Sequence, residues 1–137
     1  PIIAAGGIMD GAGINCVMNL GADGAQLGTA FLLCPESSTD AGYREAIKGA
    51  PDGLTVLTSA ISGRPARCLV NGWREINDPH LVPAYPVAYD AGKALASAAK
   101  AQGNRQFGAH WAGQGVSLIR ELPAAELIRK LVSESGF

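Results

Sequence analysis

The sequence predicts an α/β fold built on a parallel sheet. The prediction rests on a pattern that occurs twice, a short apolar strand followed by a glycine turn. Pro1–Ile8 is an apolar run that contains two adjacent glycines, and Gly24–Thr29 is a second short stretch that ends in a glycine turn. A helical pattern separates the two. Strands that alternate with helices over tight connections are typical of parallel sheets with right-handed crossovers. Because the sequence begins inside the first strand pattern, we expect a preceding segment to supply the rest of the sheet.

Apolar runs and capping residues define the elements of the first fifty residues. Ile2–Ala5 is too apolar for a half-exposed strand and is predicted to be a central parallel strand. Asp10 is a suitable N-cap for a helix that continues to about Leu20, and Gly21 stands where a helix-ending glycine is expected. The elements that follow are a strand at 24–27, a helical turn at 30–33, and a helix at 41–48 that Thr39 or Asp40 can cap.

The remainder of the chain mixes short strands, a long loop and helices. Two weakly alternating segments, 55–61 and 66–70, are predicted to be strands joined by a Gly-Arg-Pro turn, and 71–83 is predicted to be a loop. Three helices are predicted in the remaining part: 87–101 with Pro86 at its first position, 116–121 after the glycine-rich 111–115, and 124–135 with Pro123 at its start.

Composition excludes several classes of function. The 137 residues carry a formal net charge of -1 and contain no basic run, so we expect no nucleic-acid partner. The longest apolar run is too short to cross a bilayer, so we expect no membrane partner. The two histidines and three cysteines lack the spacing of a metal site, and no metal is expected. Cysteines without paired spacing predict free thiols in a reducing compartment, hence a cytoplasmic protein.

The two glycine turns are the strongest chemical signal in the sequence. Gly6 and Gly7 allow backbone N–H groups to approach an anion without a side chain in the way. Gly28 and Thr29 stand at a predicted helix start, where unpaired N–H groups and the helix dipole favour phosphate, and the Thr29 hydroxyl can add a donor. Consecutive βα loops near the end of a (β/α)8 barrel commonly form such a site. The alternative is that these glycines only form tight turns.

A second group of polar residues shares one helical stripe. Tyr85, Tyr89 and Lys93 are spaced by four, so a helix that starts at Pro86 would place them on one face. Two phenols and an ammonium group can hold a small anion or stabilise negative charge on a reacting ligand. From the spacing alone, a solvent-facing stripe with tyrosines packed at a domain edge is the slightly better interpretation.

Other polar residues carry weaker signals. Gln114 lies between glycines beside Trp111 and could contact the ring edge of a cofactor or simply close a loop. Arg64 and Arg67 flank a proline turn and are interpreted as surface charges or as an inter-element pair. His110 is interpreted as a packing residue.

The residues of these turns resemble those of one family of flavoenzymes. Ala4–Ile8 and Gly21–Leu32 are similar to the FMN-phosphate region of the nitronate monooxygenases, formerly called 2-nitropropane dioxygenases. The similarity covers nearly the whole chain, continuing through 57–67, 85–87, 111–115 and 121–124. The glycine motifs alone are shared with other FMN barrels, including enoyl-acyl-carrier reductases and inosine-monophosphate dehydrogenases, whereas the later motifs are more specific to the nitronate enzymes.

This resemblance implies an FMN-binding TIM barrel with a smaller, mostly helical substrate domain. It also implies an enzyme that oxidises alkyl nitronates with O2 to a carbonyl compound and nitrite. Residues 1–50 would form the last two βα units of the barrel with the FMN-phosphate site, and 51–137 would form a small α+β or helical substrate-side segment with the C-terminal helices. The FMN-binding residues would be Gly6, Gly7, Gln26, Leu27, Gly28 and Thr29, and the substrate-binding residues would be Tyr85, Tyr89 and Lys93.

The sequence departs from the family pattern at the catalytic base. That base is a histidine in a Gly-Gly-His context on an earlier barrel strand, and neither His80 nor His110 matches it, so no catalytic residue is assigned to this segment. We therefore expect the C-terminal part of a nitronate monooxygenase-like flavoprotein, inactive by itself and stable only beside the missing N-terminal barrel half, in the same chain or a separate one. The alternatives are an FMN-dependent NAD(P)H reductase acting on quinones or enoyl thioesters, and a non-catalytic fragment.

Overall fold

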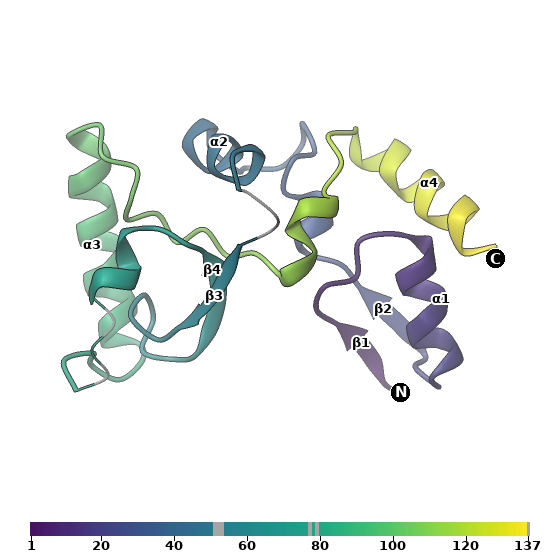
Figure 1. Cartoon of the computed structure of the whole chain (residues 1–137), viewed down its shortest axis with the longest axis horizontal. Helices are drawn as coiled ribbons and strands as arrows, with labels where there is room; N and C mark the ends of the chain where they lie inside the picture. Colours follow the sequence, from purple (N-terminus) through teal and green to yellow (C-terminus); the bar gives the residue numbers. More distant parts are fainter. Residues whose placement is uncertain (51–53, 77, 79, 137) are drawn as a thin grey trace. The chain divides into compact units, whose positions relative to one another are not determined.

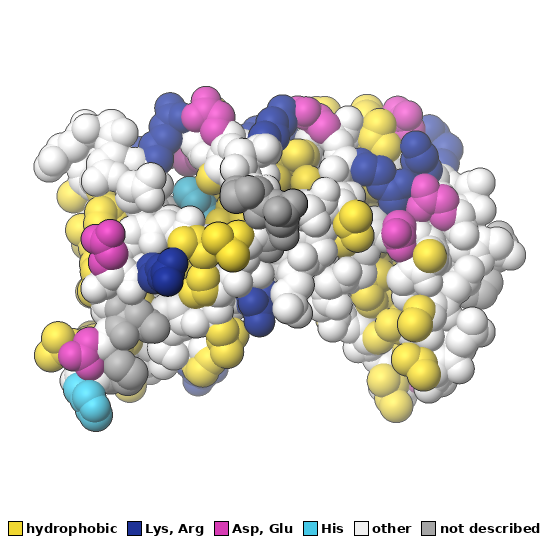
Figure 2. Space-filling view, in the orientation of Figure 1, with side chains coloured by type: hydrophobic (Ala, Val, Ile, Leu, Met, Phe, Trp, Pro, Cys, Tyr) yellow, Lys and Arg dark blue, Asp and Glu magenta, His cyan; other side chains and the backbone are white. Residues whose placement is uncertain are grey.

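The structure is a computed structural model that describes residues 1–50, 54–76, 78 and 80–136 of the chain (Figure 1). The chain forms two compact units, of which the first combines Pro1–Gly53 with Gly113–Phe137 and the second is Leu54–Ala112. Strands and helices occur in both units, in agreement with the predicted α/β class. On the face shown in Figure 2, acidic and basic side chains are interspersed.

A pair of short parallel strands organises the first unit. β1 (Ile3–Ala5) and β2 (Gly24–Gln26) are paired in parallel, with Ala4 opposite Ala25. α1 (Gly11–Asn19) connects them and begins at the predicted cap, because the Asp10 carboxylate accepts the N–H of Gly13 at 2.8 Å. The predicted β-α-β unit is therefore present, with strands one residue shorter at one end than expected.

β1 is more exposed than the sequence predicts. We expected a buried central strand, but Ile3 is 56% exposed and the neighbouring Ile2 is 67% exposed. The reason is that β2 is the only described strand that pairs with β1, so its other edge and part of its surface face solvent.

The C-terminal helix completes the first unit by packing on α1. α4 (Ala124–Ser135) contributes Leu127 and Leu131 to a core that also contains Met9, Ala30 and Cys34. The first N–H of α4, that of Ala124, donates to both carboxylate oxygens of Glu36 at 3.0 and 3.1 Å. A carboxylate in this position satisfies a helix-end donor that Pro123 cannot satisfy with its side chain.

The Glu134 carboxylate joins the last turn of α4 to the start of α1 and also forms an ion pair with Arg120. Glu134 accepts the N–H of Gly11 at 3.1 Å and a hydrogen bond from Arg120 at 2.6 Å. Arg120 also donates to the carbonyl of Met9 at 3.0 Å. The hydrogen bond from Arg120 and then that from Gly11 lower the pKa of the Glu134 carboxyl below its ordinary value.

Arg44 fixes the segment that leads into the next helix. α2 (Ala41–Lys48) has the predicted bounds, and Asp40 is its cap, since its carboxylate accepts the N–H of Tyr43 at 2.9 Å. The Arg44 guanidinium reaches back from α2 and donates to four backbone carbonyls at 2.7 to 3.2 Å; these belong to Leu33, Cys34, Ser37 and Thr39.

A β-hairpin forms the centre of the second unit. β3 (Thr55–Thr58) pairs antiparallel with β4 (Ala66–Leu69), with Val56 opposite Cys68. A strand was predicted at 55–61, but β3 ends at Thr58. It ends there because the Thr58 hydroxyl accepts the N–H of Ala60 at 3.1 Å, and this bond turns the chain away from β4. A core of Ala60, Ile61, Cys68 and Trp73 lies beside the hairpin.

Helical segments complete the second unit. The predicted loop 71–83 contains a short 3-10 helix, η3 (Gly72–Ile76), and the Asn71 side chain accepts the N–H of Trp73 at its start, at 3.2 Å. α3 (Val87–Ala101) has the predicted bounds, with Pro86 directly before it rather than inside it.

The C-terminal residues group with the first unit. Gly113–Phe137 joins the first unit because η4 (Gln114–Leu118), a 3-10 helix where a helix at 116–121 was expected, and α4 both pack against that unit. The first unit is therefore assembled from two separate stretches of sequence.

Candidate functional site

The two predicted glycine turns lie side by side in the first unit. Gly6 and Gly7 follow the last residue of β1, and Gly28 and Thr29 follow β2 one residue further on. Because Ala5 lies opposite Gln26 in a parallel pair, both strands deliver their turns to the same edge of the sheet. The six residues expected at a phosphate, which include Gln26 and Leu27, are thus gathered at one place.

The backbone of these turns presents unpaired donors. Gly6 and Gly7 have positive φ angles of 101° and 73°, and residues that carry a Cβ rarely adopt this backbone conformation. A Cβ at either position would meet no atom within 4 Å, so both glycines border open space. The N–H groups of Gly7 and Thr29 donate to no residue that the structure describes. Unpaired N–H groups on two neighbouring turns can bind an anion together.

Thr29 is held by a segment far away in the sequence. Its Oγ1 accepts the N–H of Gly113 at 2.9 Å. That bond uses a lone pair of the hydroxyl oxygen and leaves the hydroxyl proton free to donate to a ligand. The Thr29 side chain is therefore fixed as a donor at the edge where the two turns meet.

The segment that follows Gly113 packs directly on the first glycine turn. A Cβ on Gly115 would lie 2.8 Å from the carbonyl oxygen of Gly7 and 2.5 Å from Cγ of Met9. Only a glycine permits this approach. Sequence reasoning singled out the glycines around Gln114 but gave no partner for them, since no spacing rule links residues more than a hundred positions apart.

One contribution expected from the sequence is absent at these turns. We expected a helix dipole to favour phosphate at Thr29, but η1 (Thr29–Phe31) is a 3-10 turn of three residues. So few aligned peptides produce no useful dipole. Anion binding at this edge therefore depends on individual N–H groups and on the Thr29 hydroxyl.

The second predicted group is an aromatic and cationic cluster in the second unit. Tyr85 precedes α3 instead of lying within it, yet its ring stacks on that of Tyr89, with centroids 6.5 Å apart and 28° between the planes. Lys93 Nζ lies 4.3 Å from the Tyr89 ring centroid and 3.4 Å from Asp90 Oδ1. The three predicted residues are therefore in contact, and the phenol hydroxyls of both tyrosines bond to no described residue.

Arg64 joins this cluster, which sequence reasoning missed. Its guanidinium carbon lies 4.5 Å from the centroid of the Tyr85 ring. The sequence interpretation of Arg64, as a surface charge or as part of an inter-element pair, did not name Tyr85 as its partner, because the two residues are distant in sequence and no periodic signal relates them.

The side chains of His110, Cys34 and Cys68 are buried within the fold. His110 is 8% exposed and its carbonyl accepts the N–H of Leu69 at 2.9 Å, as a packing residue would. Burial raises the pKa of the Cys68 thiol, and burial followed by the nearby Glu36 carboxylate raises that of Cys34, so neither favours a thiolate. Among the residues that the structure describes, no cluster of potential ligands could hold a metal ion, and no helix is long and apolar enough to cross a membrane.

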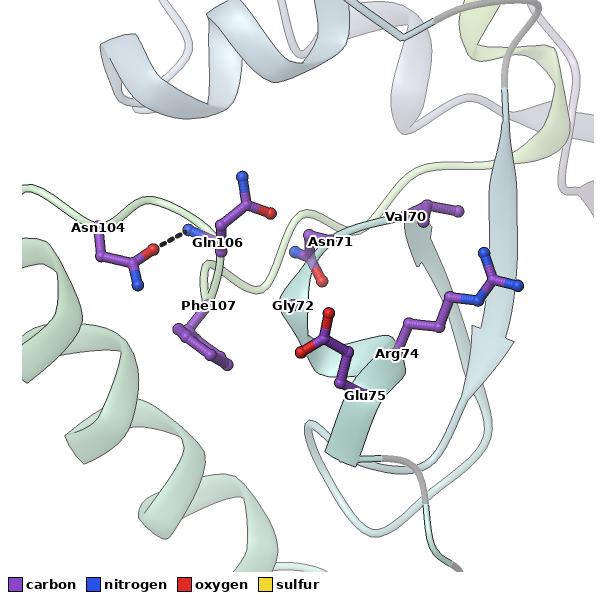
Figure 3. A pocket seen from close by; sticks show the side chains of 8 residues that line it. All are labelled: Val70, Asn71, Gly72, Arg74, Glu75, Asn104, Gln106 and Phe107. Carbon is purple, nitrogen blue, oxygen red and sulfur yellow. Dashed lines mark hydrogen bonds between the residues drawn. The ribbon is translucent and has the colours of Figure 1, made fainter.

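A separate hollow of about 510 Å³ lies in the second unit (Figure 3). It is lined by Val70, Asn71, Gly72, Arg74, Glu75, Asn104, Gln106 and Phe107. Asn71 donates to the carbonyl of Gly108 at 2.9 Å, so this amide supports the fold. The tyrosine and lysine cluster does not line this hollow.

Comparison with known proteins identifies the family. A family model described as "Nitronate monooxygenase" matches residues 1–134. A nitronate monooxygenase of Pseudomonas aeruginosa is 56% identical over 137 residues, covering 98% of this chain and 39% of the relative. A nitronate monooxygenase of Paraburkholderia phytofirmans is 57% identical, covering 98% of this chain and 37% of the relative. The chain thus spans about two fifths of the length of these curated relatives.

Solved structures agree with the sequence matches. The nitroalkane oxidase from Streptomyces ansochromogenes has a TM-score of 0.90 and 43% identity, covering 99% of this chain and 39% of that protein. FabK from Thermotoga maritima has a TM-score of 0.75 and 34% identity, covering 99% of this chain and 44% of that protein. The chain belongs to the nitronate monooxygenase family.

Proposed function

We propose that the protein containing this chain oxidises alkyl nitronates with O2, using bound FMN, to a carbonyl compound and nitrite. Membership of the nitronate monooxygenase family supports the reaction class. The observation that carries the proposal for this chain is the anion cradle: free N–H groups of Gly7 and Thr29 and a Thr29 hydroxyl fixed by Gly113 at the ends of two parallel strands. This chain would anchor the cofactor and line the substrate side.

The cradle fits the phosphate of FMN. Gly6 and Gly7 border open space and expose backbone without a Cβ, so phosphate oxygens can reach the N–H groups. Gly28 and Thr29 would face the same phosphate from the second turn, with Gln26 and Leu27 as the residues leading into it. FMN supplies the redox chemistry when bound, and these residues hold and orient it.

The aromatic and cationic cluster would bind the nitronate. A nitronate is an anion whose charge is shared by two oxygens, so ammonium and phenol donors suit it. The Lys93 ammonium would attract it, and the hydroxyls of Tyr85 and Tyr89, which bond to no described residue, can donate to it. In this role the three side chains bind and orient the substrate and do not transfer its proton.

The base that the reaction needs would lie outside these 137 residues. His80 is exposed, and its N–H donates to Asp78, whereas His110 is a buried packing residue. We propose that an N-terminal barrel part, in the same or a separate chain, supplies the base, the remaining strands of a TIM barrel and the cover for Ile3 on β1 and the adjacent Ile2. Residues 1–50 would belong to that barrel, and 51–137 would provide the substrate-side and C-terminal segments.

The unpaired state of the cysteines supports a reducing compartment. Cys16, Cys34 and Cys68 are all free. We place the protein in the cytoplasm on this basis.

The test uses purified protein that contains this chain, loaded with FMN. We expect it to consume O2 and release nitrite when propyl-2-nitronate is added, and we expect nitronate to bleach the flavin absorbance under anaerobic conditions. Bleaching by NADH or NADPH, with none by nitronate, would replace the proposal by the alternative of an FMN-dependent NAD(P)H reductase. A protein that takes up no flavin would point to a non-catalytic fragment.

A further inference from the structure

We propose that Arg64 is a further substrate-side residue, which positions Tyr85 and supplies the uncompensated positive charge that attracts a planar anion to the cluster. The cluster then consists of four side chains, Arg64, Tyr85, Tyr89 and Lys93. The identity of the anion as a nitronate rests on the proposed function, whereas the charge and geometry of the cluster do not.

The four side chains make a continuous series of contacts. The Arg64 guanidinium lies 4.5 Å from the Tyr85 ring centroid, the two tyrosine rings are stacked 6.5 Å apart, and Lys93 Nζ lies 4.3 Å from the Tyr89 ring centroid. A cation therefore contacts each ring of the stacked pair. Such contacts are attractive because the ring face is electron-rich, and Arg stacks especially well on it.

The two cations differ in how their charge is balanced. Lys93 shares its charge with Asp90, whose Oδ1 lies 3.4 Å away. The Arg64 guanidinium has no hydrogen bond or ion pair to any residue within the described part of the chain. The cluster therefore carries one excess positive charge, and its source is Arg64.

The backbone holds Arg64 next to Tyr85. Gly63 has a φ of 80°, and a Cβ there would lie 2.5 Å from the Pro83 carbonyl oxygen and 2.6 Å from the Tyr85 nitrogen. The Ser62 hydroxyl accepts the N–H of Arg64 at 3.3 Å and donates to its carbonyl at 3.1 Å. These contacts fix the turn against the segment that leads into α3, so the Arg64 backbone is held close to Tyr85 and its guanidinium can stack on the ring.

This placement suits recognition of an anion with two oxygens. A guanidinium presents parallel N–H donors that match a carboxylate-like pair of oxygens, and its charge is permanent. By stacking on Tyr85, Arg64 also restrains the ring that carries one of the free phenol hydroxyls. Arg64 thus favours a charged nitronate over a neutral nitroalkane and acts as a positioning residue for Tyr85.

The kinetic test compares Arg64→Gln and Arg64→Lys with Arg74→Gln in the FMN-loaded protein. Arg74 is an exposed arginine of the same unit whose side chain bonds to no described residue, which makes it the matched control. We expect Arg64→Gln to raise KM for propyl-2-nitronate about three- to tenfold, with a smaller change in kcat and a weaker dependence of kcat/KM on salt. Arg64→Lys should restore the salt dependence and Arg74→Gln should change nothing. An unchanged KM in Arg64→Gln, or an equal effect in Arg74→Gln, would overturn the proposal.

A binding measurement separates this proposal from the proposed function. Sodium nitrate is a planar anion that cannot be oxidised, and its binding can be followed by calorimetry without turnover. We expect wild type and Arg74→Gln to bind nitrate equally and Arg64→Gln to bind it several-fold more weakly, with all variants unfolding at the same urea concentration. If nitronate is not turned over but this difference persists, the proposed function fails and the role of Arg64 stands. If wild type does not bind nitrate, or all variants bind it alike, the role of Arg64 is refuted.

Discussion

Replacing Thr29 by valine tests the anion cradle through two separate measurements. Valine keeps the shape of threonine and removes the hydroxyl. The N–H of Gly113, which Thr29 Oγ1 accepts at 2.9 Å, then loses its partner. Thr29 is only partly buried, so water can replace part of this bond, and we expect the free energy of unfolding to fall by about 1 kcal/mol.

The same substitution should weaken FMN binding by more than it weakens the fold. A hydrogen bond to a charged group contributes about 1.5 to 3 kcal/mol, which corresponds to roughly a ten- to hundredfold higher Kd for FMN. Urea unfolding of the apoprotein measures the first effect, and quenching of flavin fluorescence on titration measures the second. Thr29→Ser, which keeps the hydroxyl, is the matched control and should retain most of the affinity. Unchanged FMN affinity in Thr29→Val, or a loss in Thr29→Ser as large as in Thr29→Val, would refute the assignment of the hydroxyl to the phosphate.

Three further predictions concern stability. The folded state lowers the pKa of the Glu134 carboxyl, so ionised Glu134 stabilises the fold above the pKa that it has in the unfolded chain. This stabilisation is lost as pH falls through the lower pKa of the folded state. The urea midpoint of wild type should therefore fall more on acidification than that of Glu134→Gln, and parallel pH profiles would contradict this. Arg44→Met removes donors from four carbonyls and should lower the free energy of unfolding by about 1 to 3 kcal/mol, whereas the exposed Arg129→Met should not; equal midpoints for the two would show that the Arg44 bonds contribute nothing. Glu36→Ala removes the acceptor at the start of α4 and should cost about 1 kcal/mol in urea unfolding, while Glu75→Ala, a carboxylate without a described partner, leaves stability unchanged.

Local signals in the sequence predicted the helices well. Asp10 and Asp40 each cap the helix that they were expected to cap, and α2, α3 and α4 have the predicted bounds. These elements depend on residues three or four positions apart, which sequence patterns contain. The ends of β3 were less predictable because the Thr58 side chain, and not strand propensity, stops the ladder.

The contacts that assemble each site could not be predicted from sequence. The spacing of Tyr85, Tyr89 and Lys93 predicted a shared face, and their contacts agree with it even though Tyr85 lies before the helix. The bond from Gly113 to Thr29 and the contact of Arg64 with Tyr85 join separate elements. Such pairs are fixed by tertiary packing, for which a single sequence carries no periodic or local signal.

The assembly of the first unit from two separate stretches of sequence has a consequence for folding during synthesis. Residues 54–112 form a continuous unit, whereas the first unit requires Gly113–Phe137 to complete it. A ribosome adds about 5 to 20 residues per second. Leu127 and Leu131, which complete the core of the first unit, are therefore synthesised several seconds after β1 and β2. During that interval Met9 and its neighbours lack their final cover. A nascent chain that ends before residue 124 therefore lacks the helix whose leucines cover this core, and its apolar residues are open to chaperones and proteases.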